Sequence, residues 1–257
     1  MATAVPADPR RPATILHTSD CHLAGYNGGR EEPAFAKAID LALSEQVDAV
    51  LITGDLFDHA RVPDSLLDWT VAQLDRLALP VVMIPGNHDV FDEGSIHHRF
   101  TVSDRCANVQ FIDAPAGRIV EIPGTDVVVW GRAMPEHEPD FRPLTGLPPQ
   151  PVHRWSIAAG HGLIMDGDEP TYRSSPIYES DLAAVHWDYV ALGHIHRYSV
   201  VRDDPTPARY AGATASSLNG SPGVVLVDFV PGLGAQPRWV SLAEAETEAD
   251  AEAEVLS

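Results

Sequence analysis

The sequence predicts an α/β fold, on two observations. Residues 13–84 alternate short apolar runs with segments of helical spacing, in the order strand, helix, strand, helix, strand, which is typical of a parallel βαβαβ unit with right-handed crossovers. Residues 109–242 contain short strands separated by turns, which favours a second, largely antiparallel sheet. Of the 257 residues 44% are hydrophobic, so we expect residues 13–242 to form one domain around one large core.

Helical periodicity and buried-looking runs mark the elements of the first unit. Pro33 stands where a first helical turn tolerates proline, and Phe35, Ile39 and Leu43 repeat at helical spacing. We therefore expect these three apolar side chains on the inner face of a helix. The expected elements are strands at 13–18, 48–53 and 79–84 and helices at 33–45 and 63–77.

The later strands are shorter and lie between turns. The runs 118–122 and 127–130 are joined by a Pro-Gly turn, which indicates antiparallel pairing. The Pro-rich segment 135–151 is expected to be a loop. Further strands are expected at 109–112, 154–159, 188–192, 198–202, 209–211, 224–230 and 238–242.

Both ends of the chain lack the pattern of a packed element. Pro6, Pro9 and Pro12 deny regular structure to residues 1–12, which we expect to form a flexible arm. Residues 243–257 are an alanine- and glutamate-rich acidic tract. We expect this tract to be a disordered, solvated tail.

The composition narrows the class of protein. Seventeen basic against 37 acidic residues give a formal net charge of −20 at pH 7. This argues against an extended basic groove for nucleic acid, although a bound metal pair can reverse the sign locally. Two cysteines cannot form a disulfide framework. Neither a long apolar run nor a signal-like N-terminus is present, so we expect a cytoplasmic protein with no membrane partner.

Five apolar runs stop at a short polar motif that contains His, Asp or Asn. In open α/β sheets the carboxyl ends of the strands form a common rim, where residues far apart in sequence meet. One such His or Asp is more often a hydrogen-bonded or capping residue, but five endings of this kind favour a shared site. The motif residues are Asp20 and His22, Asp55, Asn87 and His88, His161, and His194 and His196.

These side chains are suited to divalent metal ions. Residues two apart in an extended segment point the same way, so Asp20 and His22 can hold one ion while Cys21 points elsewhere. Asp58, which precedes a helix, is more simply explained as a loop-stabilising acid than as a direct ligand. Without His88 the set has seven candidate ligands, which are too many for one tetrahedral ion and suit two ions that share a carboxylate.

The ordered motifs resemble those of the calcineurin-like metallophosphoesterase superfamily. These motifs are Asp-x-His at Asp20, Gly-Asp-x-x-Asp at Gly54, Gly-Asn-His-Asp at Gly86, Gly-His at Gly160 and Gly-His-x-His at Gly193. Their flanking residues are similar to the SbcD-type DNA repair exonuclease branch. The resemblance implies a four-layer α-β-β-α sandwich of two mixed β-sheets flanked by helices.

The resemblance also implies a role for each ligand, with Asp55 bridging two ions. Asp20, His22 and His196 would hold the first ion, and Asn87, His161 and His194 the second. Mixed oxygen and imidazole donors suit Mn²⁺, our first choice, as well as Fe or Zn²⁺. A hydroxide bridging the two ions would attack phosphorus in line.

His88 is the candidate acid that neutralises the leaving alkoxide, with Asp89 orienting its ring. A structural hydrogen-bonding role for His88 is the alternative. Three histidines could line the substrate entrance, His59, His97 and His98, and Arg132 could meet a substrate phosphate. Loop residues of these types are more often solvated.

The resemblance predicts a dinuclear metal-dependent phosphodiesterase related to DNA exonucleases. Its substrate would be a phosphoester, with DNA as one candidate, and an SbcC-type ATPase would be a partner. Two alternatives stay open: hydrolysis of small phosphoesters such as cyclic nucleotides, and a metal-free interaction module on the same fold. Seven polar groups that converge at one rim argue against the module, because burying unused polar groups is costly.

Overall fold

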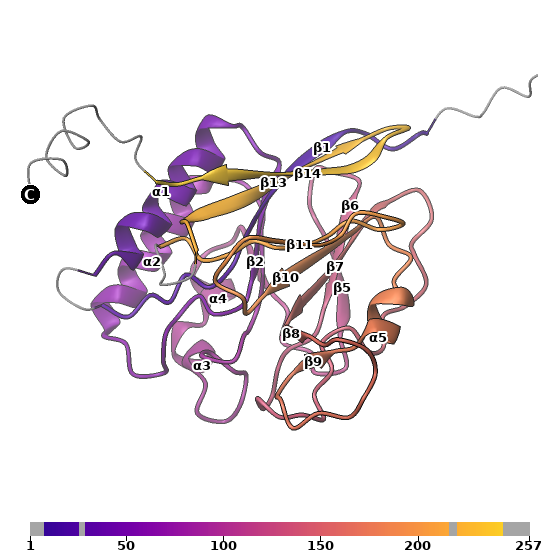
Figure 1. Ribbon diagram of the computed structural model, residues 1–257. Helices are drawn as coiled ribbons and strands as arrows, with labels where there is room; N and C mark the ends of the chain where they lie inside the picture. The colour runs from indigo at the N-terminus through magenta and orange to yellow at the C-terminus, as the bar shows by residue number, and fades with distance from the viewer. Residues whose placement is uncertain (1–7, 26–28, 216–219, 244–257) are drawn as a thin grey trace, which may run out of the picture.

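The computed structural model describes residues 8–25, 29–215 and 220–243. Two six-stranded β-sheets pack face to face, and the two long helices cover the outer face of the first sheet (Figure 1). The acidic tract from residue 244 onward and residues 1–7 of the expected arm lie outside the described residues. None of the described helices is long and apolar enough to cross a membrane.

The first sheet contains the predicted parallel unit. It comprises, with its helices, β1 (Ala13–Thr18), α1 (Glu31–Ser44), β2 (Ala49–Thr53), α2 (Asp64–Leu77), β3 (Val81–Ile84), α3 (Ile96–Phe100), α4 (Val102–Arg105), β4 (Val109–Phe111), β13 (Gly223–Val230) and β14 (Gly234–Ser241). The strand order is β14-β13-β1-β2-β3-β4. Strands β1 to β4 are parallel, which confirms the order predicted from the alternation of strands and helices.

The second sheet has the order β11-β12-β10-β7-β6-β5. Its strands are β5 (Arg118–Glu121), β6 (Val127–Gly131), β7 (Trp155–His161), β10 (Tyr189–Gly193), β11 (Ser199–Arg202) and β12 (Ala208–Tyr210), and β8 (Leu163–Ile164), β9 (Pro176–Ile177) and α5 (Glu179–Ala183) lie beside it. The predicted antiparallel pairing of β5 with β6 is confirmed.

The prediction of a largely antiparallel second sheet was wrong in two respects. Strands β6, β7, β10 and β12 pair in parallel, and β13 and β14 belong to the first sheet instead. Strand β13 is almost fully buried along its length. Such a strand needs a neighbour on both edges and cover on both faces, which it finds between β1 and β14.

Two apolar layers hold the sandwich together. Ile15, Leu51, Ile157 and Tyr189 belong to the core between the sheets, and α1 packs on the outer face of the first sheet through buried Phe35 and Ile39. Leu43 was expected to face inward with them but is 40% exposed, because the short side chains of Ala38 and Ala42 complete the buried stripe instead.

The fourth layer is thin. The outer face of the second sheet is covered by α5 and by loops, through Leu144, Leu182 and Trp187. The α-β-β-α arrangement is thereby confirmed, and within the described residues α5 is the one short helix on this side (Figure 1).

Residues 8–12 are fastened to the second sheet, contrary to the expectation of a loose arm. The Arg10 guanidinium stacks 3.5 Å from the centre of the Trp155 ring and donates a hydrogen bond to Asp188. Arg11 pairs with Asp126, and its carbonyl accepts a hydrogen bond from the Trp155 indole. Pro9 and Pro12 disfavour regular structure in this segment, but the two arginines supply the contacts that fix it.

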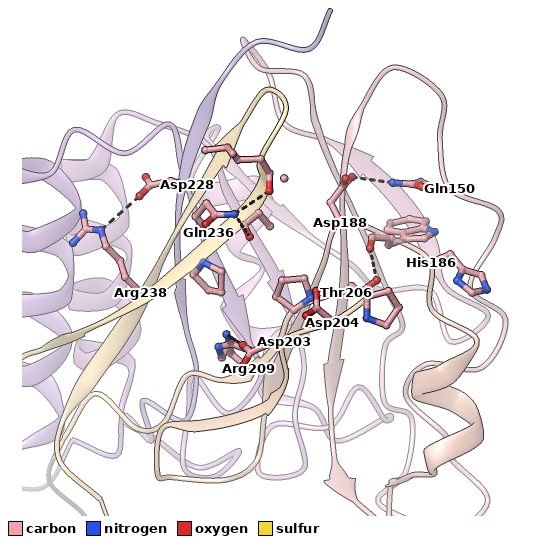
Figure 2. Close-up of a pocket in the computed structure, with 17 residues that line it drawn as sticks. Gln150, His186, Asp188, Asp203, Asp204, Thr206, Arg209, Asp228, Gln236 and Arg238 are labelled. Carbon is pink, nitrogen blue, oxygen red and sulfur yellow. Dashed lines mark hydrogen bonds and ion pairs between the residues drawn. The ribbon is translucent and has the colours of Figure 1, made fainter. Parts of the chain in front are cut away.

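A pocket of about 680 Å³ opens beside the start of β10 and β14 (Figure 2). None of the seven candidate ligands lines it. Two ion pairs lie in its wall, Arg209 with Asp203 and Arg238 with Asp228. Because none of the candidate ligands lines this pocket, we place the candidate site elsewhere.

Candidate metal centre

Five strand ends meet at one edge of the sandwich. Strands β1, β2 and β3 are parallel neighbours in the first sheet, and β7 and β10 are parallel neighbours in the second. Their carboxyl ends therefore lie together. The structure brings all seven candidate ligands into contact there, in two groups that share one carboxylate.

The first group contains Asp20, His22 and His196. The Nε2 atoms of His22 and His196 are 3.0 Å apart, and the Nε2 atom of His196 lies 3.6 Å from Oδ1 of Asp20. Asp20 is buried, and its carboxylate accepts hydrogen bonds from the backbone N–H of His194. The three residues thus present one oxygen and two imidazole donors to a common point.

The second group contains Asn87, His161 and His194. Oδ1 of Asn87 lies 2.9 Å from Nε2 of His161 and 2.8 Å from Nδ1 of His194. The His161 ring donates from Nδ1 to the carbonyl oxygen of Thr53, at 2.8 Å. That hydrogen bond directs the Nε2 atom of His161 toward Asn87.

Asp55 lies between the two groups. Its Oδ2 atom is 3.8 Å from Nε2 of His22 and 3.3 Å from Nε2 of His161, while Oδ1 accepts a hydrogen bond from the backbone N–H of His88. Burial alone would raise the pKa of Asp55, but the His161 ring beside it holds this pKa well below its usual range. The shared carboxylate is therefore ionised.

The histidines of the second group differ in their affinity for protons. Burial opposes charge on His161, yet the carboxylates of Asp55 and Asp20 raise its pKa to about 9. Burial, together with repulsion from a charged His161, lowers the pKa of His194 to about 4. A proton on His161 thus offsets buried negative charge when no metal is bound, and a metal ion that binds Nε2 must displace this proton.

The donor separations fit divalent metal ions. Adjacent donors around an octahedral ion with bonds of about 2.1 Å are about 3 Å apart. The close pairs in the two groups are separated by 2.8 to 3.0 Å. Carboxylate, amide and imidazole donors together form a set that suits transition-metal ions.

The backbone at Asp20 and His22 has a left-handed conformation that the sequence did not suggest. Asp20 and His22 were expected in an extended segment, but their φ angles are 52° and 49°, because β1 already ends at Thr18. Left-handed backbone of this kind is costly for residues other than glycine and is typical of functional sites. A Cβ atom at Gly86 would lie 2.2 Å from Oδ1 of Asp55, so the close approach of these loops requires glycine there.

The sequence had suggested that Asp89 orients His88, and the structure shows that this prediction was wrong. Its buried carboxylate instead accepts hydrogen bonds from four backbone N–H groups, those of Gly86, Asp55, Leu56 and Phe57. Consecutive side chains in this turn point in different directions, and Asp89 points inward while His88 is exposed. Asp89 therefore ties the loop after β2 to the loop after β3.

Replacing Asp89 by Asn is expected to lower the free energy of unfolding by about 3 kcal/mol. An amide cannot accept from all four donors, and buried donors that lose a charged acceptor are costly. Urea denaturation followed by tryptophan fluorescence measures the loss. Asp113→Asn, at an exposed pair with Arg118, is the control and should stay close to wild type. An equally small effect of both substitutions would contradict the role of Asp89.

Asp58 is the acid that holds His88 and His22. Its Oδ1 atom lies 3.2 Å from Nδ1 of His22 and 3.4 Å from Nδ1 of His88, and its carbonyl oxygen is 2.9 Å from Nδ1 of His88. Both rings thus turn Nε2 away from Asp58. The second Asp of Gly-Asp-x-x-Asp was the available signal in the sequence, but the motif by itself did not separate this role from loop stabilisation.

Substituting Asp58 by Ala is expected to weaken Mn²⁺ binding at the first group about 10- to 100-fold, the usual effect of losing a partner that orients a ligand. Without the carboxylate, the His22 ring loses its preferred orientation and tautomer. Titration calorimetry with Mn²⁺ measures the affinity. Asp64→Ala, at an exposed acid that pairs with Arg99, should leave it unchanged. Equal affinity in the Asp58 variant and wild type would refute the prediction.

Two of the residues expected at the entrance, Arg132 and His97, have other surroundings, whereas the place of His59 and His98 there stays a prediction. Arg132 does not face the site: its guanidinium donates to the carbonyl oxygens of Pro115 and Arg142, so it anchors a loop. His97 is buried and cannot line an entrance. His59 accepts a hydrogen bond from the backbone N–H of Arg61.

A histidine that the sequence did not distinguish from a surface residue lies near the site. The ring centre of His137 is 5.9 Å from that of His194. Burial and the nearby charge of His161 lower the pKa of His137. It reaches this place on a loop that carries no strand or helix, so periodicity in the sequence could not have placed it.

The sequence profile of the calcineurin-like phosphoesterase family matches residues 13–198. Among solved structures, a dimetal phosphatase from Danio rerio superposes with a TM-score of 0.55, at 11% sequence identity, over 90% of this chain and 99% of that one. At that identity the superposition shows the fold alone.

Two curated relatives are similar along most of the chain. The present chain is 29% identical over 218 residues to the DNA double-strand break repair protein Mre11 of Aeropyrum pernix, and the match covers 77% of this chain and 52% of that protein. It is 27% identical over 264 residues to the SbcD component of the nuclease SbcCD of Bacillus subtilis, covering 85% of this chain and 66% of that protein. The similarity to the SbcD-type branch is thereby confirmed, while the chain spans about half to two thirds of the length of these relatives.

Proposed function

The chain belongs to the calcineurin-like phosphoesterase family, and we propose that it is a phosphodiesterase whose centre holds two divalent ions. The observation that carries the proposal is the position of Asp55. Its carboxylate contacts an imidazole of each donor group, so one ionised side chain can serve both ions. Two bound ions would supply an activated water and neutralise charge on the phosphoryl oxygens.

Each donor group would hold one ion. Asp20, His22 and His196 would hold the first, and Asn87, His161 and His194 the second, with Asp55 between them. The hydrogen bonds from Nδ1 of His22 to Asp58 and from Nδ1 of His161 to Thr53 leave the Nε2 atoms of these two rings directed into the centre. Mn²⁺ is the ion that we propose first, because the donors mix oxygen and imidazole nitrogen.

His88 is the proton donor in this proposal. Its side chain is 41% exposed, and Nδ1 is held by the carbonyl oxygen of Asp58. The Nε2 atom is therefore available to a leaving group at the mouth of the site. A positioned imidazole of this kind contributes about 10² to 10⁴ in rate when the leaving group needs a proton.

A substrate panel with Mn²⁺ tests the proposal. The panel contains bis(p-nitrophenyl) phosphate, p-nitrophenyl phosphate, cyclic nucleotides, and single- and double-stranded DNA. We expect hydrolysis of bis(p-nitrophenyl) phosphate that requires Mn²⁺ and is abolished by a chelator. Absence of turnover on every substrate, with two ions shown to be bound, would overturn the proposal.

The names of the relatives point to DNA and to a protein partner. Mre11 is named for double-strand break repair, and the second relative is a component of SbcCD. On this similarity, DNA is one proposed substrate of the present chain and an SbcC-type ATPase is a proposed partner. Co-purification with an SbcC-type ATPase would test the partner.

A second candidate, hydrolysis of small phosphoesters, is favoured by the charge around the site. Three loops, which we call the rim loops, comprise residues 91–95, 134–141 and 165–175. Hydrogen bonds join them, from the N–H of Phe91 to the carbonyl of Met134 and from the N–H of Ser175 to the carbonyl of Glu138. The rim loops contain eight exposed acids and one arginine, Arg173.

Salt dependence separates the two candidates. Repulsion by the rim loops would be screened by salt, so binding of a labelled single-stranded oligonucleotide should strengthen as salt rises. A nuclease that contacts several phosphates would lose affinity steeply instead. Fluorescence anisotropy with Mn²⁺ present, recorded while the labelled oligonucleotide is still intact, gives the sign directly.

A further inference from the structure

His97 is a polar side chain buried among aromatic rings, and packing alone does not explain why an imidazole is present there. It belongs to α3, and its side chain is 2% exposed. Its ring stacks on Phe111, with centres 4.3 Å apart and an interplanar angle of 29°, and lies 6.3 Å from the Phe57 ring. Within the described residues neither ring nitrogen has a hydrogen-bond partner of normal geometry.

A phenylalanine could fill the same space at lower cost. Burying an imidazole N–H without a partner costs roughly 1–3 kcal/mol, whereas a benzene ring would keep both aromatic contacts. Phe57 also packs edge-on against Phe100, at 4.9 Å, so the surroundings are those of an apolar core. Packing therefore does not account for the two ring nitrogens of His97.

The polar edge of the His97 ring faces Asp89. Nε2 of His97 lies 3.4 Å from Oδ2 of Asp89, and the same oxygen accepts the backbone N–H of Leu56 and that of Phe57. The other oxygen, Oδ1, accepts the backbone N–H of Asp55. One imidazole thus contacts the loop after β2 twice, through the Asp89 carboxylate and through the Phe57 ring.

The loop after β2 carries two carboxylates of the metal centre. It carries Asp55, which lies between the two donor groups, and Asp58, which holds the rings of His22 and His88. A carboxylate that can rotate would let the loop shift, and a shift of a few tenths of an ångström would spoil donor geometry that metal ions require. A buried N–H dipole that faces the carboxylate opposes such rotation.

We propose that His97 is a positioning residue for the metal centre: it fixes the Asp89 carboxylate and, through it, the loop that carries Asp55 and Asp58. This inference rests on the proposed function, because it assigns His97 a part in metal binding. It requires only that Nε2 carries a hydrogen, which both the neutral and the charged ring can provide.

Two variants separate positioning from packing. His97→Phe keeps the aromatic stack and removes Nε2–H, so we expect unfolding free energy equal to or above that of wild type and Mn²⁺ affinity weaker by about 10- to 100-fold. His97→Gln returns an N–H group near the same place with poorer packing. We expect this variant to be less stable, yet to bind Mn²⁺ within about threefold of wild type.

Titration calorimetry with Mn²⁺ alone and urea denaturation of the metal-free protein provide the two readouts. His186→Phe, at an exposed histidine beside the pocket of Figure 2, is the matched control and should change neither. If His97 only fills space in the core, Mn²⁺ affinity should be unchanged in every variant that folds. That result would overturn the inference.

The two proposals can fail separately. If wild type binds two Mn²⁺ ions and His97→Phe binds them equally well, the inference about His97 is wrong and the proposed function stands. If wild type itself binds no Mn²⁺ and hydrolyses no phosphodiester, the proposed function fails. The Asp89→Asn variant adds a further check, because His97→Phe should weaken metal binding little in that background if the two residues act as a unit.

Discussion

Asp55→Asn is expected to reduce turnover of bis(p-nitrophenyl) phosphate by about 10³ or more and to leave fewer than two ions bound. Asparagine keeps the shape of the side chain but removes the negative charge that lies between the two donor groups. The catalytic effect of bound metal ions is several kcal/mol, and about 4 kcal/mol corresponds to a factor of about 10³ in rate. Steady-state kinetics and metal analysis of the same preparation measure both effects.

The control for Asp55 is an acid of the same type outside the centre. Asp104→Asn, at an exposed position in α4, should retain two ions and wild-type turnover. Circular dichroism should show that the Asp55 variant remains folded, so that the loss reports the site. Two bound ions together with turnover within about tenfold of wild type would show that Asp55 is not shared.

His88→Asn is expected to lower turnover by about 10² or more on esters with a poor leaving group, while metal content stays near that of wild type. The asparagine amide can donate to the carbonyl oxygen of Asp58, as Nδ1 of His88 does, so the loop is preserved. What the substitution removes is Nε2, the proposed source of the proton. A dinucleotide, whose leaving group is an alkoxide, is the substrate for this test.

The leaving group provides the internal comparison for His88. A p-nitrophenolate needs little help from an acid, so the same variant should lose much less activity on bis(p-nitrophenyl) phosphate. His88 also lies near His22 and Asp55, within reach of a shared ion. If the variant lost metal, or lost activity equally on both leaving groups, His88 would be a ligand or a structural residue and not the acid.

Much of the fold could be predicted because its signals are local. The limits of β1 are those expected from the apolar run 13–18, and α2 differs from its predicted span by one residue. The short helices α3, α4 and α5 were not predicted, because four or five residues give no periodicity to recognise. The placement of β13 beside β1 also escaped prediction, because strand pairing depends on contacts between distant segments.

The candidate site shows the same division between local and distant contacts. The order of residues along the chain was enough to identify which residue types end the strands, and with them the seven candidate ligands and the family. The contacts of each carboxylate followed only from the folded chain: Asp89 turned inward to four N–H groups, and Asp58 took the place beside His88. Motif spacing is a property of one chain segment, whereas the direction of a side chain is set by the backbone and by neighbours that arrive from elsewhere in the fold.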